Sequence, residues 1–194
     1  MLSKSFFQRK NVVLVAKELL GKTLVTVTNG LITSGTIVET EAYSFRERGC
    51  HAYLNRMTER NRVMFDEGGI AYVYLCYGIH NLFNVVTNKK SNAEAVLIRS
   101  LQPKQGEELM KVRMRKTSLK RITSGPGKLT KALGIDRTHN GKNLMSSDIW
   151  IEEGIQVARK DIVTTTRVGI DYAGEDAKLP WRFYLKDNIW VSKQ

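Results

Sequence analysis

The sequence predicts an α+β fold in a single domain, residues 1–194, with antiparallel strands predominating. The chain has 194 residues, of which 42% are hydrophobic, and this is enough to build one core. Only 3 prolines occur, and no stretch rich in Pro, Gly or Ser divides the chain. Strand-like and helix-like segments follow one another without the regular alternation that produces parallel sheets, which favours α+β over α/β.

The N-terminal part is expected to form one helix and then two strands. Apolar residues recur at helical spacing from Val12 to Leu20, and Gly21 ends the pattern. This run is too short and too interrupted to cross a membrane. Two strand-like runs follow, at 22–28 and 35–43, and a turn at Asn29–Gly30 lies between them.

The rest of the chain is expected to alternate between loops, strands and short helices. Residues 45–67 are polar and predict a loop with one helical turn. A Gly/Pro loop at 124–128 leads into a short helix. The remaining expected elements are strands at 71–77, 81–87 and 94–101 joined by turns at 78–80 and 88–92, a basic helix at 107–116, and a tail of strands from Arg167 onward with turns at Gly174 and Asn188.

Charge and cysteine content narrow the functional classes. Lys and Arg number 31 against 19 for Asp and Glu, a net charge of +12. Such an excess suits a polyanion such as nucleic acid, although a soluble basic protein can carry it without function. The sequence contains no clear Lys/Arg-rich amphipathic helix with exposed aromatic residues, so binding to a membrane surface is not expected. Two cysteines, Cys50 and Cys76, do not make a disulfide scaffold, and they favour a reducing cytosol.

The sequence gives little support for a metal site or for a catalytic serine or cysteine nucleophile. His51, His80 and His139 are far apart and lack metal-ligand spacing, so no metal site is expected. Cys50 adjoins His51, but sequence neighbours rarely form a catalytic pair, and no G-x-S-x-G motif occurs. Cys76 lies in an apolar run and is expected in the core.

The stretch VETEAY, residues 38–43, places acids in an apolar strand. Because side chains alternate along a strand, Glu39, Glu41 and Tyr43 are expected on one face. A carboxylate beside an aromatic cavity can act as a general base on water, although the same pattern also occurs by accident on a surface. Arg99, inside an apolar strand, is expected either to pair with Glu39 or Glu41 or to face solvent.

Aromatic residues offer a possible base-binding surface. Tyr43, Tyr72, Tyr74 and Tyr77 lie in two segments. Such rings can hold an unstacked base, and they are also ordinary strand formers. Tyr77 precedes a glycine in a tight turn, where it has little core to pack into and can wedge into a base stack. Asn84, polar among apolar neighbours, either bonds a base edge or pins a turn.

The segment SGPGK, residues 124–128, resembles a phosphate loop but lacks the G-x-x-x-x-G-K-[ST] spacing. Backbone N–H groups at Gly125 and Gly127, with the charge of Lys128, can contact a DNA phosphate at a helix N-terminus. A plain turn followed by a helix start is an equally good interpretation.

Seven segments in the same order resemble the 3-methyladenine (alkyladenine) DNA glycosylase family in its bacterial form. They are ELLGKTLV, IVETEAY, HAY followed by TERNRVMF, GIAYVYLCYGIHNLFNVV, AVLIRSLQPKQG, SGPGKLTKALGI and RVGIDYAGEDAKLPWRFYL. The resemblance implies one compact α+β domain with a curved, mainly antiparallel sheet, flanking helices and a protruding β-hairpin that enters the DNA minor groove. This sequence departs from the family pattern at residues 44–50, SFRERGC, where the family often has a more acidic loop with small residues.

The activity that the resemblance implies is DNA repair. Family members flip an alkylated or deaminated purine (3-methyladenine, hypoxanthine or ethenoadenine type) out of duplex DNA. They hydrolyse its N-glycosidic bond with a Glu-activated water and leave an abasic site, without metal, cofactor or Schiff-base lysine. The expected partner is double-stranded DNA that contains damaged purines. The protein is expected to be a monomer and to lie in the bacterial cytosol, associated with the nucleoid. A non-catalytic damaged-DNA or RNA binding protein on the same scaffold is the alternative.

The resemblance also implies a role for each matching residue. Glu41 is the general base and Arg99 helps to hold the catalytic water; Tyr43, His51 and Tyr74 form the base pocket; Asn84 disfavours normal guanine; and Tyr77 intercalates where the base has left. Glu39, two residues from Glu41 on the same strand, is interpreted as structural.

Overall fold

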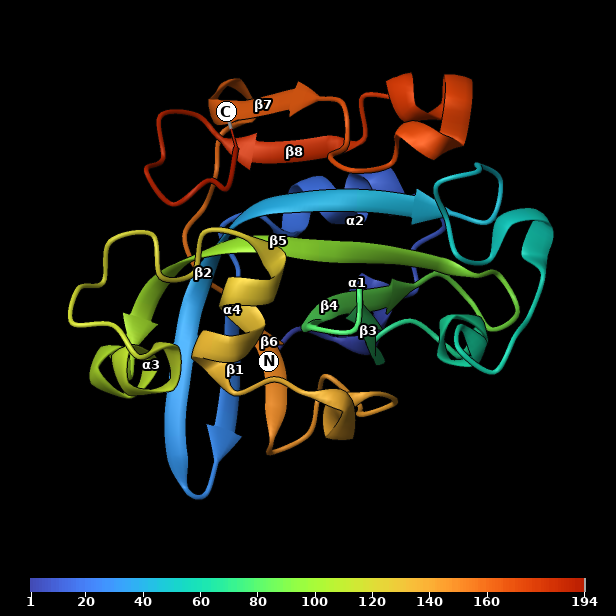
Figure 1. The fold of residues 1–194 in the computed structure, drawn as a ribbon. Coiled ribbons are helices and arrows are strands. Elements are labelled where there is room, and N and C mark those ends of the chain that lie inside the picture. The colour runs from blue at the N-terminus through green and yellow to red at the C-terminus, as the bar shows by residue number, and fades with distance from the viewer. Residues whose placement is uncertain (194) are drawn as a thin grey trace.

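An eight-stranded sheet organises the computed structural model, which describes residues 1–193 (Figure 1). The strand order is β3-β4-β5-β2-β1-β6; β8 also pairs with β2, and β7 pairs with β8. Every strand pair recorded is antiparallel, so the predicted α+β class and strand direction are confirmed. The strands are β1 (Thr23–Thr28), β2 (Leu31–Ser44), β3 (Ala71–Cys76), β4 (His80–Thr87), β5 (Glu94–Gln105), β6 (Ile149–Glu152), β7 (Ile162–Thr165) and β8 (Arg182–Leu185).

Short helices flank this sheet. Figure 1 shows α3 beside α4 on one side of the molecule and α2 behind the upper part of the sheet. None of the helices within residues 1–193 has the length and apolar character to span a membrane. The α-helices are α1 (Lys4–Phe7), α2 (Val12–Leu19), α3 (Glu107–Met114) and α4 (Pro126–Leu133); the 3-10 helices are η1 (Tyr53–Asn55), η2 (Arg62–Phe65), η3 (Arg137–His139), η4 (Arg159–Asp161) and η5 (Asp171–Lys178).

Helix α2 confirms the first predicted element. Its apolar residues at helical spacing are buried, and the hydroxyl of Thr40 on β2 donates to the Ala16 carbonyl at 2.9 Å. Gly21 has φ +84°, and a Cβ there would lie 2.4 Å from the Ile155 carbonyl oxygen. The chain therefore needs glycine where the helical pattern stops.

Strand β2 runs through the whole sheet and changes direction within it. Its register against β5 shifts between Ser34 and Gly35 and again around Glu39. Such irregularities bend a strand and increase its twist. Figure 1 shows the result: β2 first runs beside β1 and then turns to run between β5 and β8. The bend brings the VETEAY end of β2 to the place where β5, β8 and the β3–β4 pair meet.

The predicted meander is confirmed as β3, β4 and β5, but of the tail of strands expected from Arg167 onward the structure contains only β8. Residues 171–178 form the 3-10 helix η5, and Gly174 within it has φ 60°. Near its end β2 pairs with β5 on one edge as far as Ser44, and at Glu39, Thr40 and Glu41 it pairs with β8 on the other. The segment instead makes local backbone bonds, such as Ala173 N–H to the Ile170 carbonyl at 2.8 Å. Residues 45–67 hold two short 3-10 turns rather than one.

Candidate active site

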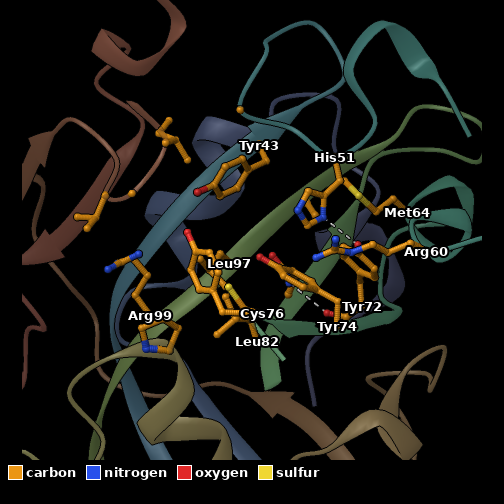
Figure 2. Close-up of a pocket in the computed structure, with 18 of the residues that line it drawn as sticks. Tyr43, His51, Arg60, Met64, Tyr72, Tyr74, Cys76, Leu82, Leu97 and Arg99 are labelled. Carbon is orange, nitrogen blue, oxygen red and sulfur yellow. Dashed lines mark hydrogen bonds between the residues drawn. The ribbon is translucent and has the colours of Figure 1, made fainter. Parts of the chain in front are cut away.

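A cavity of about 390 Å³ opens where the ends of β2 and β5 meet the β3–β4 pair (Figure 2). A cavity of this size suits one small planar ligand. Aromatic rings and apolar side chains form most of its lining, and the polar groups are few. The lining residues are Tyr43, Gly49, His51, Arg60, Met64, Tyr72, Tyr74, Cys76, Tyr77, Leu82, Asn84, Ala95, Leu97, Arg99, Pro126, Val168, Gly169, Ile170 and Tyr172.

Two aromatic walls face each other across this cavity. Figure 2 shows the Tyr43 ring on one side of the open space, and His51 and Tyr74 on the other. The centroids of His51 and Tyr74 lie 4.6 Å apart at 71°, and Tyr72 lies 5.3 Å from Tyr74. The predicted grouping of Tyr43, His51 and Tyr74 in one pocket is therefore what the structure contains. The space between the walls can accept a flat ring.

His51 is held in place by Tyr72, whose hydroxyl lies 2.9 Å from Nδ1. The ring borders the open cavity, and burial together with the charge of Arg60 lowers the pKa of His51 to about 4. His51 is thus neutral near pH 7, about three units above that pKa. With Nδ1 engaged by Tyr72, Nε2 is the ring nitrogen left for a ligand.

Glu41 is fully buried and lies immediately behind the cavity surface. Its Oε2 accepts from the Tyr43 hydroxyl at 2.8 Å and from Arg99 Nη1 at 3.2 Å, and its Oε1 accepts from the Val168 N–H at 2.8 Å. These three partners line the cavity although Glu41 does not. A molecule in the cavity reaches the carboxylate by displacing or sharing one of them.

Glu39 occupies a different environment two residues away. Its Oε1 accepts from Arg99 Nε at 3.0 Å and Arg182 Nε at 2.8 Å, and hydroxyls of Ser100 and Ser192 add bonds of 2.8 and 2.9 Å. Burial raises the pKa of the Glu39 carboxyl, but the two arginines and the serine hydrogen bonds outweigh it, and the pKa lies below its ordinary 4.5. This carboxylate belongs to the scaffold. The predicted pairing of Arg99 with Glu39 or Glu41 is confirmed for both acids.

Asn84 lies in the cavity floor on β4, opposite Leu97 of β5. Its Nδ2 donates to the Tyr72 carbonyl on β3 at 3.1 Å. The interpretation that it pins a turn is wrong, because the residue sits inside a strand and braces the neighbouring one. A bond to a base edge stays a prediction.

Tyr77 stands at the tip of the β3–β4 hairpin and is 90% exposed. Tyr77 has φ 49° and Gly78 has φ 73°, and the Ile79 N–H donates to the Cys76 carbonyl at 3.1 Å. Positive φ at both central residues is what a type I′ hairpin turn requires. A tyrosine is a costly choice for that conformation, and such strain gathers at functional positions.

The glycines of SGPGK have structural partners. Gly125 N–H donates to the Ser100 hydroxyl at 3.1 Å. A Cβ at Gly127 would lie 2.8 Å from the His80 ring, so α4 packs closely against the base of the hairpin. The turn followed by a helix start, with Pro126 as the first residue of α4, is confirmed. Lys128 is exposed. A phosphate contact through Gly125, Gly127 and Lys128 stays a prediction.

The two cysteines differ in burial, and Cys76 does not lie where it was expected. Cys76 is half-buried and borders the cavity, so the prediction of a core position is wrong; it ends β3 beside the hairpin turn. Cys50 is the buried one, and burial raises the pKa of its thiol to about 12, which leaves it a poor nucleophile. Over residues 1–193 no three His, Cys, Asp or Glu side chains gather as a candidate metal site.

Two contributors, the Val168 N–H and Arg60, escaped prediction, and a third, Tyr72, was predicted only in part. The Val168 N–H reaches Glu41, and a backbone donor has no side-chain signature in a sequence. Tyr72 was visible only as one of several aromatic residues, and its partner His51 lies 21 residues away. Arg60 places its guanidinium carbon 5.1 Å from the centre of the Tyr74 ring, at the end of a loop without periodicity.

Comparison with known proteins gives one consistent result. A family model described as methylpurine-DNA glycosylase matches residues 5–189. Proteins from Carboxydothermus hydrogenoformans, Chlamydia felis and Bdellovibrio bacteriovorus are 49%, 47% and 44% identical to this chain, each match covering 100% of both chains. All three carry the provisional name 3-methyladenine DNA glycosylase.

Proposed function

The chain belongs to the methylpurine-DNA glycosylase family, and on that premise we propose that it releases alkylated or deaminated purines from duplex DNA with Glu41 as general base. It is a 3-methyladenine DNA glycosylase, a hydrolase of N-glycosyl bonds. The reaction class follows from the family. The substrate range and the part played by each residue are the proposal.

The observation that carries the proposal is the position of the Glu41 carboxylate behind an aromatic cavity. The cavity walls, Tyr43 on one side and His51 with Tyr74 on the other, suit a purine taken out of the base stack. Arg99 Nη1 and the Val168 N–H donate hydrogen bonds to this carboxylate and orient it beside the cavity. A binding module has no need for a buried acid at this point.

Hydrolysis then proceeds on the sugar of the flipped nucleotide. Glu41 takes a proton from water as the water oxygen bonds to C1′, and the C1′–N bond breaks with its electron pair leaving on the base. The negative charge of Glu41 also stabilises the oxocarbenium-like transition state. The water reaches Oε2 by taking the place of the Tyr43 hydroxyl, which donates to that oxygen at 2.8 Å.

Base chemistry sets the substrate class. A purine alkylated on a ring nitrogen carries positive charge and leaves without further protonation, whereas hypoxanthine needs a proton or hydrogen bond on the leaving ring. Unpairing costs least for damaged or mispaired bases, so part of the selectivity precedes the chemical step. Tyr77, exposed at the hairpin tip, fills the gap left in the stack.

The test is single-turnover release of base from duplexes that contain hypoxanthine or ethenoadenine, with EDTA present. Wild type is compared with Glu41→Gln, and Glu153→Gln serves as a matched control, because Glu153 is an exposed acid paired with Lys22 and does not line the cavity. We expect wild type and Glu153→Gln to leave abasic sites at the same rate. Glu41→Gln is expected to bind the lesion duplex and to be slower by about 10²–10⁴-fold, the usual contribution of a general base.

Equal activity of Glu41→Gln and wild type would remove Glu41 from the mechanism. If wild type releases neither hypoxanthine nor ethenoadenine, alkylated DNA containing 3-methyladenine is the next substrate. Lesion binding without release of any of these bases would favour the non-catalytic binding protein.

A further inference from the structure

A buried ion pair lies outside the cavity, behind the wall that Tyr43 forms. Nη1 and Nη2 of Arg167 lie 2.7 and 2.8 Å from the two carboxylate oxygens of Glu47. Both side chains are almost completely buried. Neither residue lines the cavity, so the pair does not touch a bound base. Its influence on the site passes through the groups that it holds.

The arginine holds the Tyr43 wall. Its guanidinium carbon lies 4.8 Å from the centre of the Tyr43 ring and 5.4 Å from that of Trp181. Its Nη1 also donates to the carbonyl of Ala42, the residue between Glu41 and Tyr43, at 3.0 Å. A planar cation against the ring and a bond to the adjoining backbone together fix where Tyr43 stands.

The carboxylate holds the loop that leads to the opposite wall. Oε2 of Glu47 accepts from the N–H of Gly49 at 2.7 Å. Gly49 lines the cavity two residues before His51, and a Cβ there would lie 2.9 Å from that same oxygen. Glu47 belongs to the segment SFRERGC, where the chain departs from the pattern of the family it resembles. In this chain Glu47 anchors that loop.

The same pair also reaches the general base. Val168 directly follows Arg167, and its N–H donates to Oε1 of Glu41 at 2.8 Å. Nη2 of Arg167 donates further to the Asp176 carbonyl at 3.0 Å, which ties this segment to η5. A shift of Arg167 therefore moves the amide that orients Glu41.

We propose that the Arg167–Glu47 pair is the positioning element of the pocket: it sets the separation of Tyr43 from His51 and holds the Val168 amide on Glu41. The catalytic part of this inference rests on the proposed function; the binding part does not. A bidentate Arg–carboxylate pair is rigid, and lysine cannot reproduce its fork of donors. A misplacement of about 1 Å in such a site can cost about 100-fold in rate.

The test uses Arg167→Lys and Glu47→Gln, two conservative changes. Arg113→Lys is the matched control: Arg113 is half-buried, donates to the Thr33 hydroxyl and the Ala132 carbonyl, and does not line the cavity. Thermal unfolding gives the folded fraction of each variant, and rates are expressed per folded molecule. Glu47→Gln, the milder change, carries the test if Arg167→Lys fails to fold.

Two readouts are taken. The first is the saturating single-turnover rate of hypoxanthine release, with its pH profile. The second is the ratio of affinities for ethenoadenine and undamaged duplexes, measured in a Glu41→Gln background so that no cleavage intervenes. We expect Arg167→Lys and Glu47→Gln to lose about 100-fold in rate, because both change the position of the pocket walls. Their affinity ratio is expected to fall at least about tenfold, the contribution of one good base–ring stack.

Arg113→Lys is expected to change the melting temperature alone. If the two pair variants match Arg113→Lys in rate, pH profile and affinity ratio, the pair is merely structural and the inference is overturned. If wild type releases no base but the affinity ratio still falls in the pair variants, the positioning inference stands while the proposed catalytic function fails.

Discussion

Arg99 joins Glu41 to Glu39: its Nη1 lies 3.2 Å from Oε2 of Glu41, and its Nε lies 3.0 Å from Oε1 of Glu39. The two acids are two residues apart on β2 and have different environments. A second arginine, Arg182, also pairs with Glu39, whereas Glu41 receives the Tyr43 hydroxyl and a backbone amide instead. One carboxylate is thus locked into the scaffold, and the other keeps a partner that a ligand can displace.

Glu39→Gln is expected to destabilise the fold by about 3–5 kcal/mol, because it leaves two buried arginines with less compensating charge. The pKa of Glu39 is held below 4.5, so its stabilising contribution is present above that pH and is lost as pH falls through the lower folded pKa. Urea unfolding at about pH 7 and about pH 3 measures both effects. The difference between wild type and variant is expected to shrink at the acid pH.

Glu94→Gln is the matched control for that experiment. Glu94 is equally buried, but its cationic partner is the exposed Arg46, at 3.4 Å. Burial raises the pKa of Glu94, with Asn88 and Ser44 hydrogen bonds opposing it, so this acid is closer to neutral and Gln is a closer substitute. If Glu94→Gln lowers the free energy of unfolding as much as Glu39→Gln does, the two arginines are not the reason for the large contribution of Glu39.

Tyr43→Phe is expected to retain base release, at the wild-type rate or above it. The substitution keeps the stacking ring and removes the hydroxyl that occupies Oε2 of Glu41, so water no longer competes for that position. Burial, reinforced by the neighbouring Glu41, raises the pKa of Tyr43 well above 10, so the hydroxyl is a donor at neutral pH. Loss of this bond to a carboxylate is expected to cost about 1.5–3 kcal/mol of stability.

Single-turnover kinetics on a hypoxanthine duplex provide the measurement, with Tyr43→Leu as the comparison that also removes the ring. We expect Tyr43→Leu to be slow and Tyr43→Phe to be active. A phenylalanine variant as inactive as Glu41→Gln would show that the hydroxyl takes part in the chemistry.

Periodicity accounts for the parts of the fold and site that were predictable. Alternation along VETEAY placed Glu39, Glu41 and Tyr43 together, and the position of Arg99 in an apolar strand predicted either an acidic partner or a solvent-facing side chain. The structure contains the bond from Tyr43 to Glu41 and pairs Arg99 with both acids. The first inference succeeded because a strand places alternate residues on one face, and the second because a charged side chain among apolar neighbours needs a partner. The resemblance to a known family then added the wall residues, which no periodicity distinguishes from ordinary core.

What escaped prediction depends on contacts between distant segments. Arg167 and Glu47 are 120 residues apart, and nothing in the local pattern of either segment pairs them. The tail was expected to form strands, but residues 171–178 form the 3-10 helix η5 and only β8 joins the sheet, beside β2. Tertiary pairing decides such segments, and it is invisible to local pattern.

His51→Gln is expected to flatten the acid side of the stability profile. The pKa of His51 is lowered to about 4 from 6.5, by burial first and Arg60 second, so the unfolded state binds the proton more tightly. Wild type therefore loses stability as pH falls from about 6.5 to about 4, and the variant lacks that part of the slope. Denaturant unfolding at several pH values measures the slope. An unchanged slope in His51→Gln would show that this ring does not titrate as proposed.

Tyr77→Ala and Tyr77→Gly are expected to lose lesion-specific DNA binding and base release to the same extent and to differ in the free energy of unfolding. Both remove the exposed ring at the hairpin tip, so lesion-specific binding and base release are expected to fall more than binding to undamaged duplex. Equal losses in specific and nonspecific binding would argue against intercalation.

Stability separates the two variants because Tyr77 has φ 49°. Alanine keeps the unfavourable left-handed conformation, whereas glycine relieves it, a difference of about 1 kcal/mol. We therefore expect Tyr77→Gly to be more stable than Tyr77→Ala, and at least as stable as wild type, because the tyrosine ring makes little contact with the core. Urea unfolding of the three proteins tests this order. If Tyr77→Gly is the least stable of the three proteins, the Tyr77 side chain stabilises the hairpin turn by more than its left-handed backbone conformation costs.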